Sequence, residues 1–451
     1  MPRRYFLETF GCQMNVHDSE RLAGLLEREG YERTPDERSA DVVVLNTCSV
    51  RERAEDKLYT RLGEVRDAVA DRKDKPIVAV TGCVAQQEGA DLLKSRLPID
   101  VVAGTQRLKE LPGLIQEAVL RGKPQVDVRP HDDVSFPLGV ARYSDPVRAL
   151  VTIIEGCNEF CAFCVVPYTR GHERMRPVAD ILAEVREAVN SGRSEVHLLG
   201  QIVNHYCAPD DSSCDFAALL ERVSAIPGIA RIRFASPHPR HVDERLIGAI
   251  RNLPAVCKHL HLPVQSGSNR VLAAMRRRYT REIYLDLVGQ LRDEVPGIAL
   301  STDMIVGFPG ETDEDFEQTL DLVRTARYHS MYSFKYSPRP NTLAFRRLPD
   351  DVPESEKTRR ILALQDLQRD VQGEWFRHAI GSTVEVLVDS ISRRRESELA
   401  GRTSGNTVVN FPGPHGWVGR LVTVRITGAG PNSLRGELAE TSSPAETGHV
   451  D

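Results

Sequence analysis

Residues 155–171 read EGCNEFCAFCVVPYTRG and place three cysteines, Cys157, Cys161 and Cys164, within eight positions. The stretch directly follows an apolar run, residues 150–154, that is typical of a buried strand. Cysteine thiolates are ligands for zinc or for an iron–sulfur cluster. Three cysteines without a fourth beside them leave one iron of a four-iron cluster without a protein ligand, and that iron can bind a substrate or a cofactor.

Structural zinc is the alternative reading of this stretch, with His172 as a fourth ligand. Structural zinc usually stabilises small, loop-rich modules, and a large domain does not need it. The sequence therefore favours a cluster and leaves zinc open.

Strands and helices alternate throughout residues 148–375, the region that the cysteine stretch opens. Strands are expected at residues 149–154, 196–199, 232–235, 259–262, 299–306 and 332–335, and helices around residues 178–190, 215–226, 241–253, 268–276, 281–295 and 313–327. Six such units predict a partial or complete (β/α) barrel. The ligand face of a barrel is built from loops at the carboxyl ends of its strands, where the three cysteines lie.

The first 120 residues show the same alternation on a smaller scale. Strands are expected at residues 5–9, 42–46, 77–80 and 101–103, which predicts a small parallel sheet covered by helices. Cys12, Cys48 and Cys83 each follow the carboxyl end of one of these strands. Ligands bind at that edge of open α/β sheets, so the three cysteines are expected to converge. Any one of them alone would read equally well as a small buried thiol.

The segment from residue 375 to residue 440 has a different character. Short strand-like runs at residues 382–391, 406–413, 420–429 and 433–440 are separated by Gly, Pro, Asn and Ser, which predicts a small β-barrel. Its arginines are candidate RNA phosphate contacts, although a basic run is often only a solvated face. They are Arg393, Arg394, Arg395, Arg402 and Arg420. Residues 441–451 are expected to form a disordered tail.

Composition narrows the class of protein. The chain has 451 residues, of which 41% are hydrophobic and 27% charged, as in soluble proteins of two or three domains. A net charge of −5 excludes an overall polycation, so any RNA surface must be local. No apolar run fits a signal peptide or a membrane span, so a cytoplasmic protein is expected. Nine cysteines in that reducing compartment read as ligands rather than disulfides, and no P-loop pattern is present.

The motifs together resemble the methylthiotransferase family of radical S-adenosylmethionine (SAM) enzymes. The resemblance rests on C-x₃-C-x₂-C with Phe163 before its last cysteine, on the N-terminal cysteine trio, and on the segments ETFGCQMN, SPHP, HLPVQSGS, VGFPGET and YSPRP in this order. It implies an N-terminal methylthiotransferase domain over residues 3–120, a radical SAM core over residues 143–374, and an RNA-binding, OB-like TRAM domain over residues 375–440.

The resemblance also implies the chemistry. One [4Fe–4S] cluster, held by Cys157, Cys161 and Cys164, binds SAM and splits it into a 5′-deoxyadenosyl radical. A second [4Fe–4S] cluster is implied on the remaining trio, Cys12, Cys48 and Cys83, as the site from which the methylthio group is donated. One SAM gives the methyl group and another gives the radical that removes hydrogen from C2 of an adenine. Radical chemistry is required because no acid or base can ionise that C–H bond.

The implied substrate is N6-isopentenyladenosine beside the anticodon of tRNA. Two alternatives keep the chemistry and change the target, either to N6-threonylcarbamoyladenosine in tRNA or to an aspartate of a ribosomal protein. A third alternative is an RNA-binding protein with purely structural metal sites. The expected partners are the tRNA anticodon stem-loop, a reductant such as flavodoxin or ferredoxin, and a sulfur or cluster-repair donor. A monomer without membrane contact is expected.

Contacts to SAM are assigned from the same resemblance. Gly200 and Gln201 follow the second barrel strand, where the superfamily binds the SAM amine, and Ile202 replaces the asparagine usual in the family. Further candidates at strand or loop ends are Phe163, Ser236, Gln265, Ser266 and Asp303. A role in a turn or a helix cap is as good a reading for each of them.

Two further motifs have mainly local readings. Thr312 and Asp315, in and just after the segment GFPGET, predict a capping box for the next helix. Arg276, Arg277 and Arg278, before Tyr279, are candidates for RNA contact, with an exposed helix end as the alternative. The cysteines that match no ligand position of the family are expected to be structural thiols. They are Cys207, Cys214 and Cys257.

Overall fold

A six-stranded parallel sheet forms the N-terminal domain of the computed structural model, which describes residues 2–49, 52–95, 97–130, 136–393 and 395–439. The strand order is β2-β1-β3-β4-β5-β6. The strands are β1 (Arg4–Phe10), β2 (Glu32–Arg33), β3 (Val42–Thr47), β4 (Ile77–Gly82), β5 (Val101–Ala103) and β6 (Gln125–Asp127). The four predicted strands are confirmed. The two very short edge strands were not predicted, and β6 extends the sheet past residue 120.

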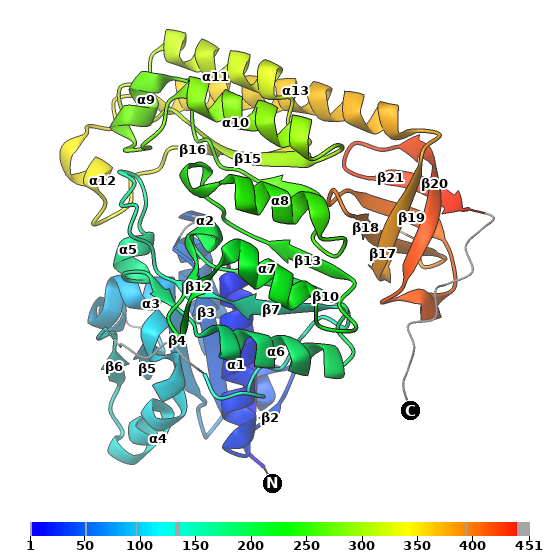
Figure 1. Cartoon of the computed structure of the whole chain (residues 1–451). Coiled ribbons are helices and arrows are strands. Elements are labelled where there is room, and N and C mark those ends of the chain that lie inside the picture. Colours follow the sequence, from blue (N-terminus) through cyan, green and yellow to red (C-terminus); the bar gives the residue numbers. More distant parts are fainter. Residues whose placement is uncertain (1, 50–51, 96, 131–135, 394, 440–451) are drawn as a thin grey trace.

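Helices cover both faces of this sheet (Figure 1). They are α1 (Gln13–Arg28), α2 (Glu52–Ala68), α3 (Cys83–Glu88) and α4 (Leu111–Arg121). Alternate residues of β3 serve the two faces: Val42 and Val44 pack with α1 and α4, and Val43 and Leu45 pack with α2 and α3. All four are buried, because a parallel strand covered on both faces has no polar side.

The central region is a partial (β/α) barrel, as predicted. Its strands lie in two parallel sheets, β13-β10-β7 and β14-β15-β16. The strands are β7 (Arg148–Thr152), β10 (Glu195–Leu199), β13 (Arg231–Phe234), β14 (His259–His261), β15 (Ala299–Val306) and β16 (Ser330–Lys335). The six predicted helices are α6 (Val178–Asn190), α7 (Phe216–Ser224), α8 (Glu244–Asn252), α9 (Asn269–Ala274), α10 (Arg281–Glu294) and α11 (Asp313–Ala326).

Shorter elements complete the region around the cysteine stretch. They are β8 (Ile154–Glu155), α5 (Val166–Thr169), β9 (Arg174–Met175), β11 (Cys207–Ala208), β12 (Asp211–Asp215) and α12 (Leu343–Arg347). The cysteine loop lies between β8 and α5, at the carboxyl ends of the barrel strands.

The longest helix, α13 (Glu354–Ala379), was not predicted. It runs past the expected domain boundary at residue 375 and leads from the barrel to the C-terminal domain (Figure 1). Its buried positions include Lys357, Arg360 and Gln368 beside Leu364 and Val371, so the apolar periodicity that identifies a helix is weak. None of the helices in the described part of the chain is both long and apolar enough to cross a membrane.

The C-terminal domain is a closed five-stranded barrel in the order β17-β18-β19-β21-β20. The strands are β17 (Thr383–Ile391), β18 (Glu398–Thr403), β19 (Val408–Pro412), β20 (Leu421–Ala429) and β21 (Leu434–Leu438), of which only β18 was not predicted. Arg231, the first residue of β13, donates to the carbonyl oxygen of Glu385 at 3.1 Å, and Arg233 donates to that of Thr403 at 2.7 Å. The small barrel therefore lies near the amino ends of the central strands, away from the cysteine loop.

A buried charged seam joins the N-terminal domain to the central barrel. Asp18 on α1 accepts a hydrogen bond from Arg170 at 2.6 Å, and Arg21 lies 3.6 Å from Glu155. All four side chains are almost fully buried. Buried charges must be paired, so this seam fixes the two domains relative to each other.

His329, which lies near the end of α13, makes the free energy of unfolding depend on pH. Its ring stacks on Trp375 at 4.1 Å, and its Nδ1 accepts a hydrogen bond from the Leu300 N–H. Burial, reinforced by Arg292, lowers the pKa of His329 from 6.5 to about 4. Since the unfolded chain then binds the proton more readily, the free energy of unfolding falls as pH drops below about 6.5, by about 1–2 kcal/mol between pH 7 and pH 5.

Urea unfolding at several pH values measures this contribution of His329. His329→Phe keeps an aromatic ring and cannot be protonated, so its free energy of unfolding should fall less between pH 7 and pH 5 than that of the wild type. Equal pH dependence in the two proteins would contradict the assignment, whatever their absolute stabilities.

Candidate active site

The N-terminal cysteines come together at the carboxyl edge of their sheet. Cys12 precedes α1, Cys48 follows β3, and Cys83 begins α3. The Cys48 thiol hydrogen-bonds with both of the other thiols, and this contact lowers the pKa values of Cys12 and Cys83 and raises that of Cys48. Cys48 and Cys83 are buried and Cys12 is exposed. A metal cluster bound here would have one open side.

Two glycines allow these thiols to meet. A Cβ on Gly11 would lie 2.6 Å from the Cβ of Cys48, and a Cβ on Gly82 would lie 2.3 Å from the carbonyl oxygen of Thr47. Gly82 also has φ +92°, a conformation that favours glycine. Each glycine directly precedes a cysteine of the trio. Because glycine has no Cβ, the backbone before Cys12 and Cys83 can lie close to the segment that carries Cys48.

A buried amide pair stabilises the same edge. Asn15 donates to Asn46 Oδ1 at 3.3 Å, and Asn46 donates back to the Asn15 carbonyl oxygen at 2.9 Å. Asn15 Oδ1 accepts from the Cys12 thiol at 3.4 Å. The pair ties the first turn of α1 to β3 and thereby holds Cys12 near Cys48.

The second trio lies in the loop between β8 and α5. Burial raises the pKa of Cys157 and of Cys164 to about 12 each, and the neighbouring Cys161 thiol adds to both shifts. Gly156 has φ +79°, and a Cβ there would lie 2.1 Å from the carbonyl oxygen of His172. Cys157 and Cys164, which are hard to ionise without a metal, share this loop with a third thiol, and such a group is consistent with a metal-ligand set because coordination deprotonates the thiol.

Arg277 is buried beside this second trio and does not lie on the surface. Its Nη1 donates to Cys161 Sγ at 3.4 Å and its Nη2 donates to the Pro263 carbonyl oxygen at 2.8 Å. The side chain is buried beside Tyr279, whose hydroxyl donates to the Val264 carbonyl oxygen. Neither residue is placed for the RNA contact that the sequence suggested; Arg276 and Arg278 on either side are exposed.

Arg170 links the two trios. It directly follows α5, and Cys164 lies two residues before the start of that helix. The charge of Arg170 lowers the pKa values of Cys12 and Cys83. Its Nη2 is held by Asp18, and its buried Nη1 has no hydrogen-bond partner in the described structure. Each thiol trio therefore has one buried arginine beside it.

These donor sets fit iron–sulfur clusters. A cluster bound by three thiolates is anionic, and a buried anion requires a nearby cation such as Arg170 or Arg277. The zinc alternative would need Nε2 of His172 as its fourth ligand, because the Nδ1 of this exposed side chain is paired with Asn158 Oδ1 at 2.9 Å.

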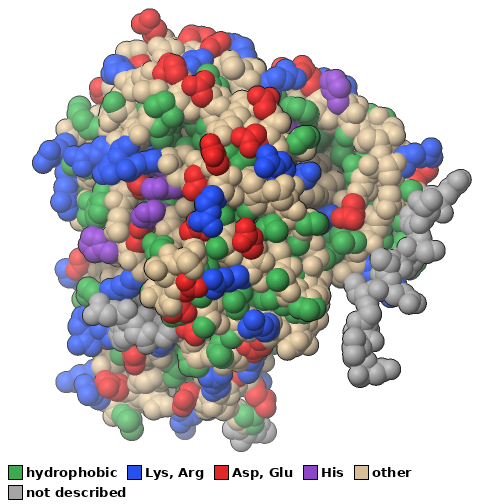
Figure 2. Space-filling view, viewed as in Figure 1, with side chains coloured by type: hydrophobic (Ala, Val, Ile, Leu, Met, Phe, Trp, Pro, Cys, Tyr) green, Lys and Arg blue, Asp and Glu red, His purple; other side chains and the backbone are tan. Residues whose placement is uncertain are grey.

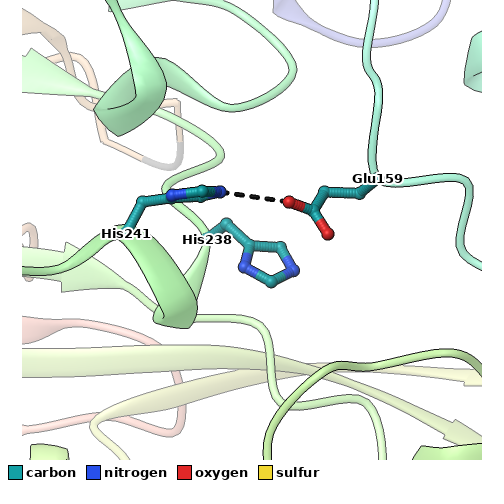
Figure 3. A group of neighbouring side chains, drawn as sticks. All are labelled: Glu159, His238 and His241. Carbon is teal, nitrogen blue, oxygen red and sulfur yellow. Dashed lines mark hydrogen bonds and ion pairs between the residues drawn. The ribbon is translucent and has the colours of Figure 1, made fainter.

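A histidine–carboxylate group borders the second trio (Figure 3). Glu159, within the cysteine loop, lies 3.1 Å from Nε2 of His241, and His238 lies beside both. The Arg240 N–H donates to Nδ1 of His238, so the neutral ring carries its proton on Nε2. A protonated Nε2 cannot bind a metal. Nε2 is buried without a partner among the described residues, so it is a donor for an acceptor on a bound molecule.

The candidate SAM contacts divide into two groups. Gly200 and Gln201 follow β10, and the buried Oε1 of Gln201 has no partner in the described structure, as an acceptor for a ligand ammonium would. Phe163 and Ser236 are half-buried near strand or loop ends. Asp303 lies 3.3 Å from Nε2 of His261.

The other group has structural partners. Gln265 is buried with φ +79° and bridges β15, accepting from the Ile305 N–H at 2.9 Å. Ser266 Oγ is fully buried and accepts from the Ser268 N–H at 3.2 Å. For these two residues the geometry favours the turn or capping reading.

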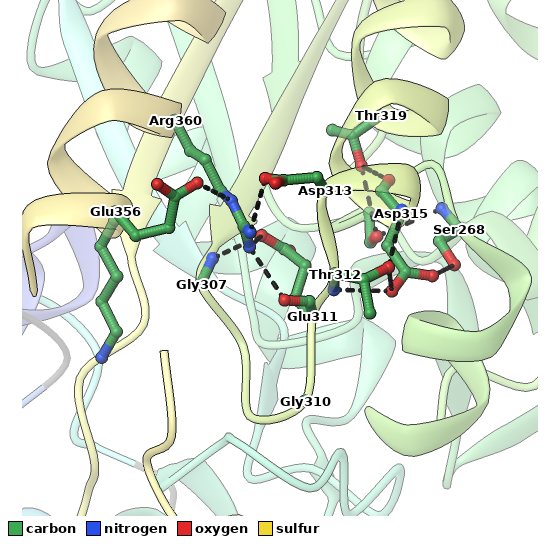
Figure 4. Close-up of polar contacts among 12 residues, drawn as sticks. Ser268, Gly307, Gly310, Glu311, Thr312, Asp313, Asp315, Thr319, Glu356 and Arg360 are labelled. Atoms are coloured by element: carbon green, nitrogen blue, oxygen red, sulfur yellow. Dashed lines mark hydrogen bonds and ion pairs between the residues drawn. The ribbon is translucent and has the colours of Figure 1, made fainter. Parts of the chain in front are cut away.

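Side chains from two other parts of the chain, before α9 and in α13, contact the GFPGET segment and the start of α11 (Figure 4). Thr312 and Asp315 form the predicted capping box of α11, and Ser268 donates to Asp315 at 2.6 Å. Glu311 accepts from the Gly307 N–H and from Arg360 of α13, each at 2.8 Å. This segment stabilises the carboxyl end of β15.

The candidate RNA arginines of the small barrel differ in availability. Arg393 and Arg420 are exposed. Arg395 is paired with Glu398 at 2.7 Å, and Arg402 is half-buried, 3.5 Å from Asp389. Arg394 lies outside the described residues, as does the tail expected at residues 441–451.

Comparison with known proteins gives the whole chain close relatives. It is 44% identical over 439 residues to tRNA-2-methylthio-N(6)-dimethylallyladenosine synthase of Thermoanaerobacter pseudethanolicus, covering 97% of this chain and 93% of the relative. It is 46% identical over 445 residues to the synthase of that name from Geobacter metallireducens, covering 96% and 98%.

The chain belongs to the tRNA-2-methylthio-N(6)-dimethylallyladenosine synthase family.

Three domain matches agree with membership of this synthase family. Residues 4–104 match uncharacterized protein family UPF0004, residues 151–323 match the radical SAM superfamily, and residues 377–439 match the TRAM domain. The radical SAM match implies SAM and a [4Fe–4S] cluster as cofactors. A solved radical SAM methyltransferase, TsrM from Kitasatospora setae with cobalamin and a [4Fe–4S] cluster bound, shares the fold at TM-score 0.58 and 17% identity, covering 76% of this chain and 77% of that one.

Sequence reasoning missed the two arginines of this synthase-family site. Arg170 stands in the cysteine stretch itself, and Arg277 was assigned to the surface as part of an arginine run. Arg170 is six residues from Cys164 and Arg277 is 116 residues from Cys161, and neither separation gives a periodic signal. Only the packing of α5 and of the segment after α9 shows which arginine is buried.

Proposed function

We propose that the protein replaces the C2 hydrogen of N6-dimethylallyladenosine, next to the anticodon of tRNA, with a methylthio group. The observation that carries the proposal is a pair of thiol trios, each with its own buried arginine, at the carboxyl ends of two adjoining parallel sheets. The near-complete alignment with synthases of this name supports the substrate.

Cys157, Cys161 and Cys164 hold the cluster that binds SAM in this proposal, and Cys12, Cys48 and Cys83 hold a second cluster. A [4Fe–4S] cluster with an open iron supplies the electron for reductive cleavage of SAM, the radical chemistry that an unactivated C–H bond requires. The exposed side of Cys12 leaves the N-terminal trio open to the substrate.

The chain's own residues bind and orient the reactants. Gln201 Oε1 accepts from the ammonium group of SAM, and His238 Nε2 donates to an acceptor on the bound molecule, since both atoms are buried without a partner among the described residues. Arg277 and Arg170 offset the negative charge of the two clusters. Arg393 and Arg420 of the small barrel contact tRNA phosphates.

The remaining partners follow from the chemistry. Each turnover needs electrons from outside the chain, so a flavodoxin or ferredoxin is the proposed reductant. The sulfur that enters the product must be replaced by a sulfur or cluster-repair donor. A monomer contains both trios and is the proposed functional unit.

Mass spectrometry of tRNA nucleosides from cells with and without the gene tests the function. Loss of 2-methylthio-N6-isopentenyladenosine, with accumulation of N6-isopentenyladenosine, is expected. Loss of a methylthiolated threonylcarbamoyladenosine would instead identify the other tRNA target, and unchanged tRNA with an unmodified ribosomal aspartate would identify the protein target.

Arg277→Gln is expected to make the reduction potential of the SAM-binding cluster more negative. The variant removes a buried positive charge that donates to Cys161, so the added electron is stabilised less. A loss of about 1.4 kcal/mol corresponds to about 60 mV for a one-electron couple. An anaerobic redox titration followed by electron paramagnetic resonance measures the potential. The exposed neighbour Arg278→Gln is the control, and equal shifts in both variants would reject a specific role of Arg277.

A further inference from the structure

Four exposed arginines surround the loop of the second trio. Arg276 and Arg278 follow α9, and Arg346 and Arg347 end α12. The backbone of Ala162, inside the loop, ties both elements to it, because its N–H donates to the Met275 carbonyl oxygen at 2.9 Å and its carbonyl oxygen accepts from the Ala344 N–H at 2.8 Å. The arginines therefore lie on two sides of the entrance to the cysteine loop.

The positive charges of these four arginines are not neutralised by carboxylates of the described part of the chain. Within the described part of the chain none of them takes part in an ion pair; Arg346 donates a long hydrogen bond of 3.4 Å to Asn341 Oδ1. Figure 2 shows Lys and Arg side chains gathered along the edge where α12 lies in Figure 1, with histidines just below them. A concentration of unpaired positive charge is unusual on a chain with a net charge of −5.

Exposed aromatic side chains lie among the arginines. Tyr168 is 43% exposed and Phe345 is 53% exposed, although large apolar side chains are normally covered. The guanidinium of Arg346 lies over the Tyr168 ring at 6.0 Å, so charge and aromatic surface adjoin. Single-stranded nucleic acid is bound by this combination, with cations on its phosphates and aromatic rings stacked on its bases.

We propose that Arg276, Arg278, Arg346, Arg347, Tyr168 and Phe345 form a mouth surface that binds the RNA strand on both sides of the target adenosine. The inference rests on the proposed function and adds the place of contact. The small C-terminal barrel lies at the amino ends of the central strands, so it cannot supply the phosphate contacts beside the reacting nucleotide. An acidic electron carrier would also suit the arginines, but it gives no reason for exposed aromatic rings.

Fluorescence anisotropy with a labelled anticodon stem-loop RNA containing N6-isopentenyladenosine tests the mouth surface. The double variant Arg346→Gln/Arg347→Gln, with reconstituted clusters, is expected to raise the Kd about tenfold and to reduce the slope of log K against log salt by about 1.4, since two phosphate contacts are lost. Arg186→Gln/Arg324→Gln makes the same change of charge on the exposed faces of α6 and α11 and should leave Kd and slope unchanged.

The aromatic residues give a second, independent measurement. Tyr168→Leu/Phe345→Leu is expected to raise the Kd about tenfold with an unchanged salt slope, because stacking involves no counterion release. Iron content and melting temperature equal to those of the wild type show that the variants are folded and loaded.

Three outcomes separate the possibilities. If wild-type protein forms the methylthio nucleoside and both double variants bind RNA as tightly as it does, the mouth surface is refuted and the proposed function stands. The arginine variant could instead bind RNA normally and cleave SAM with dithionite as the reductant, but not with flavodoxin. In that case the surface binds the electron carrier, and the RNA assignment is overturned. If the wild type forms no methylthio nucleoside from this RNA, the proposed function itself fails.

Discussion

Cys161→Ala is expected to abolish SAM cleavage, whereas Cys48→Ala is expected to retain uncoupled SAM cleavage and form no methylthio product. The two residues lie in separate thiol trios, so each variant should lose about four iron atoms per chain while the other cluster remains. A cluster held by two thiolates no longer offers a defined open iron, so loss of activity should be essentially complete rather than partial.

Anaerobic assays measure 5′-deoxyadenosine and the methylthio nucleoside in the same reaction. Cys207→Ala is the matched control, because Cys207 is an exposed cysteine of the same chain in neither trio, and it should behave as the wild type. Product formation by Cys48→Ala at the wild-type rate would remove the second cluster from the mechanism and leave the first assignment intact.

Arg170→Ala is expected to lower the free energy of unfolding by about 3–5 kcal/mol, the usual effect of leaving a buried charge without its partner. Asp18 is 1% exposed and Arg170 is 3% exposed, so water cannot replace the lost ion pair. Because the pair joins α1 to the end of α5, the first trio should also become accessible. Urea unfolding by circular dichroism gives the stability, and the labelling rate of the buried Cys48 and Cys83 thiols gives the accessibility.

Two comparisons make the Arg170 result specific. Arg66→Ala breaks an exposed ion pair with Asp67 and should leave the free energy of unfolding nearly unchanged. The double variant Asp18→Asn/Arg170→Gln removes both charges and should recover most of the stability. Failure of the double variant to recover would mean that packing, and not the buried charge, dominates at this position.

Strand positions were predictable from the sequence because buried parallel strands are continuous apolar runs. The run at residues 42–46 is an example: it is covered on both faces, and β3 ends one residue beyond it. The helix α13 was not predictable in this way, because its buried side includes Lys357 and Arg360. Their partners lie outside the helix: Asp350 is in the loop directly before it, and Glu311 is in the loop before α11. Periodicity identifies only the elements that are held by apolar contacts.

The cysteines of the candidate site could be found from the sequence, and their neighbours could not. Cysteines at the ends of parallel strands share an edge of the sheet whatever the details of the fold. Whether Arg276, Arg277 or Arg278 is buried depends on the conformation of Arg276, which has φ +58° and directs the following residue inward. An arginine run in a sequence does not contain that information.

The attachment of the small barrel to Arg231 and Arg233 places its proposed RNA contacts at the opposite end of the central strands from the cysteine loop. The central strands have about five residues, which corresponds to about 17 Å between their two ends. An RNA that reaches both ends binds with higher affinity than either contact alone would give, because the second contact forms within a complex that the first has already made. A free nucleoside or a dinucleotide can reach only one end, so with both proposed RNA surfaces in use we expect the enzyme to bind free modified nucleosides weakly and to act on adenosines within a folded hairpin.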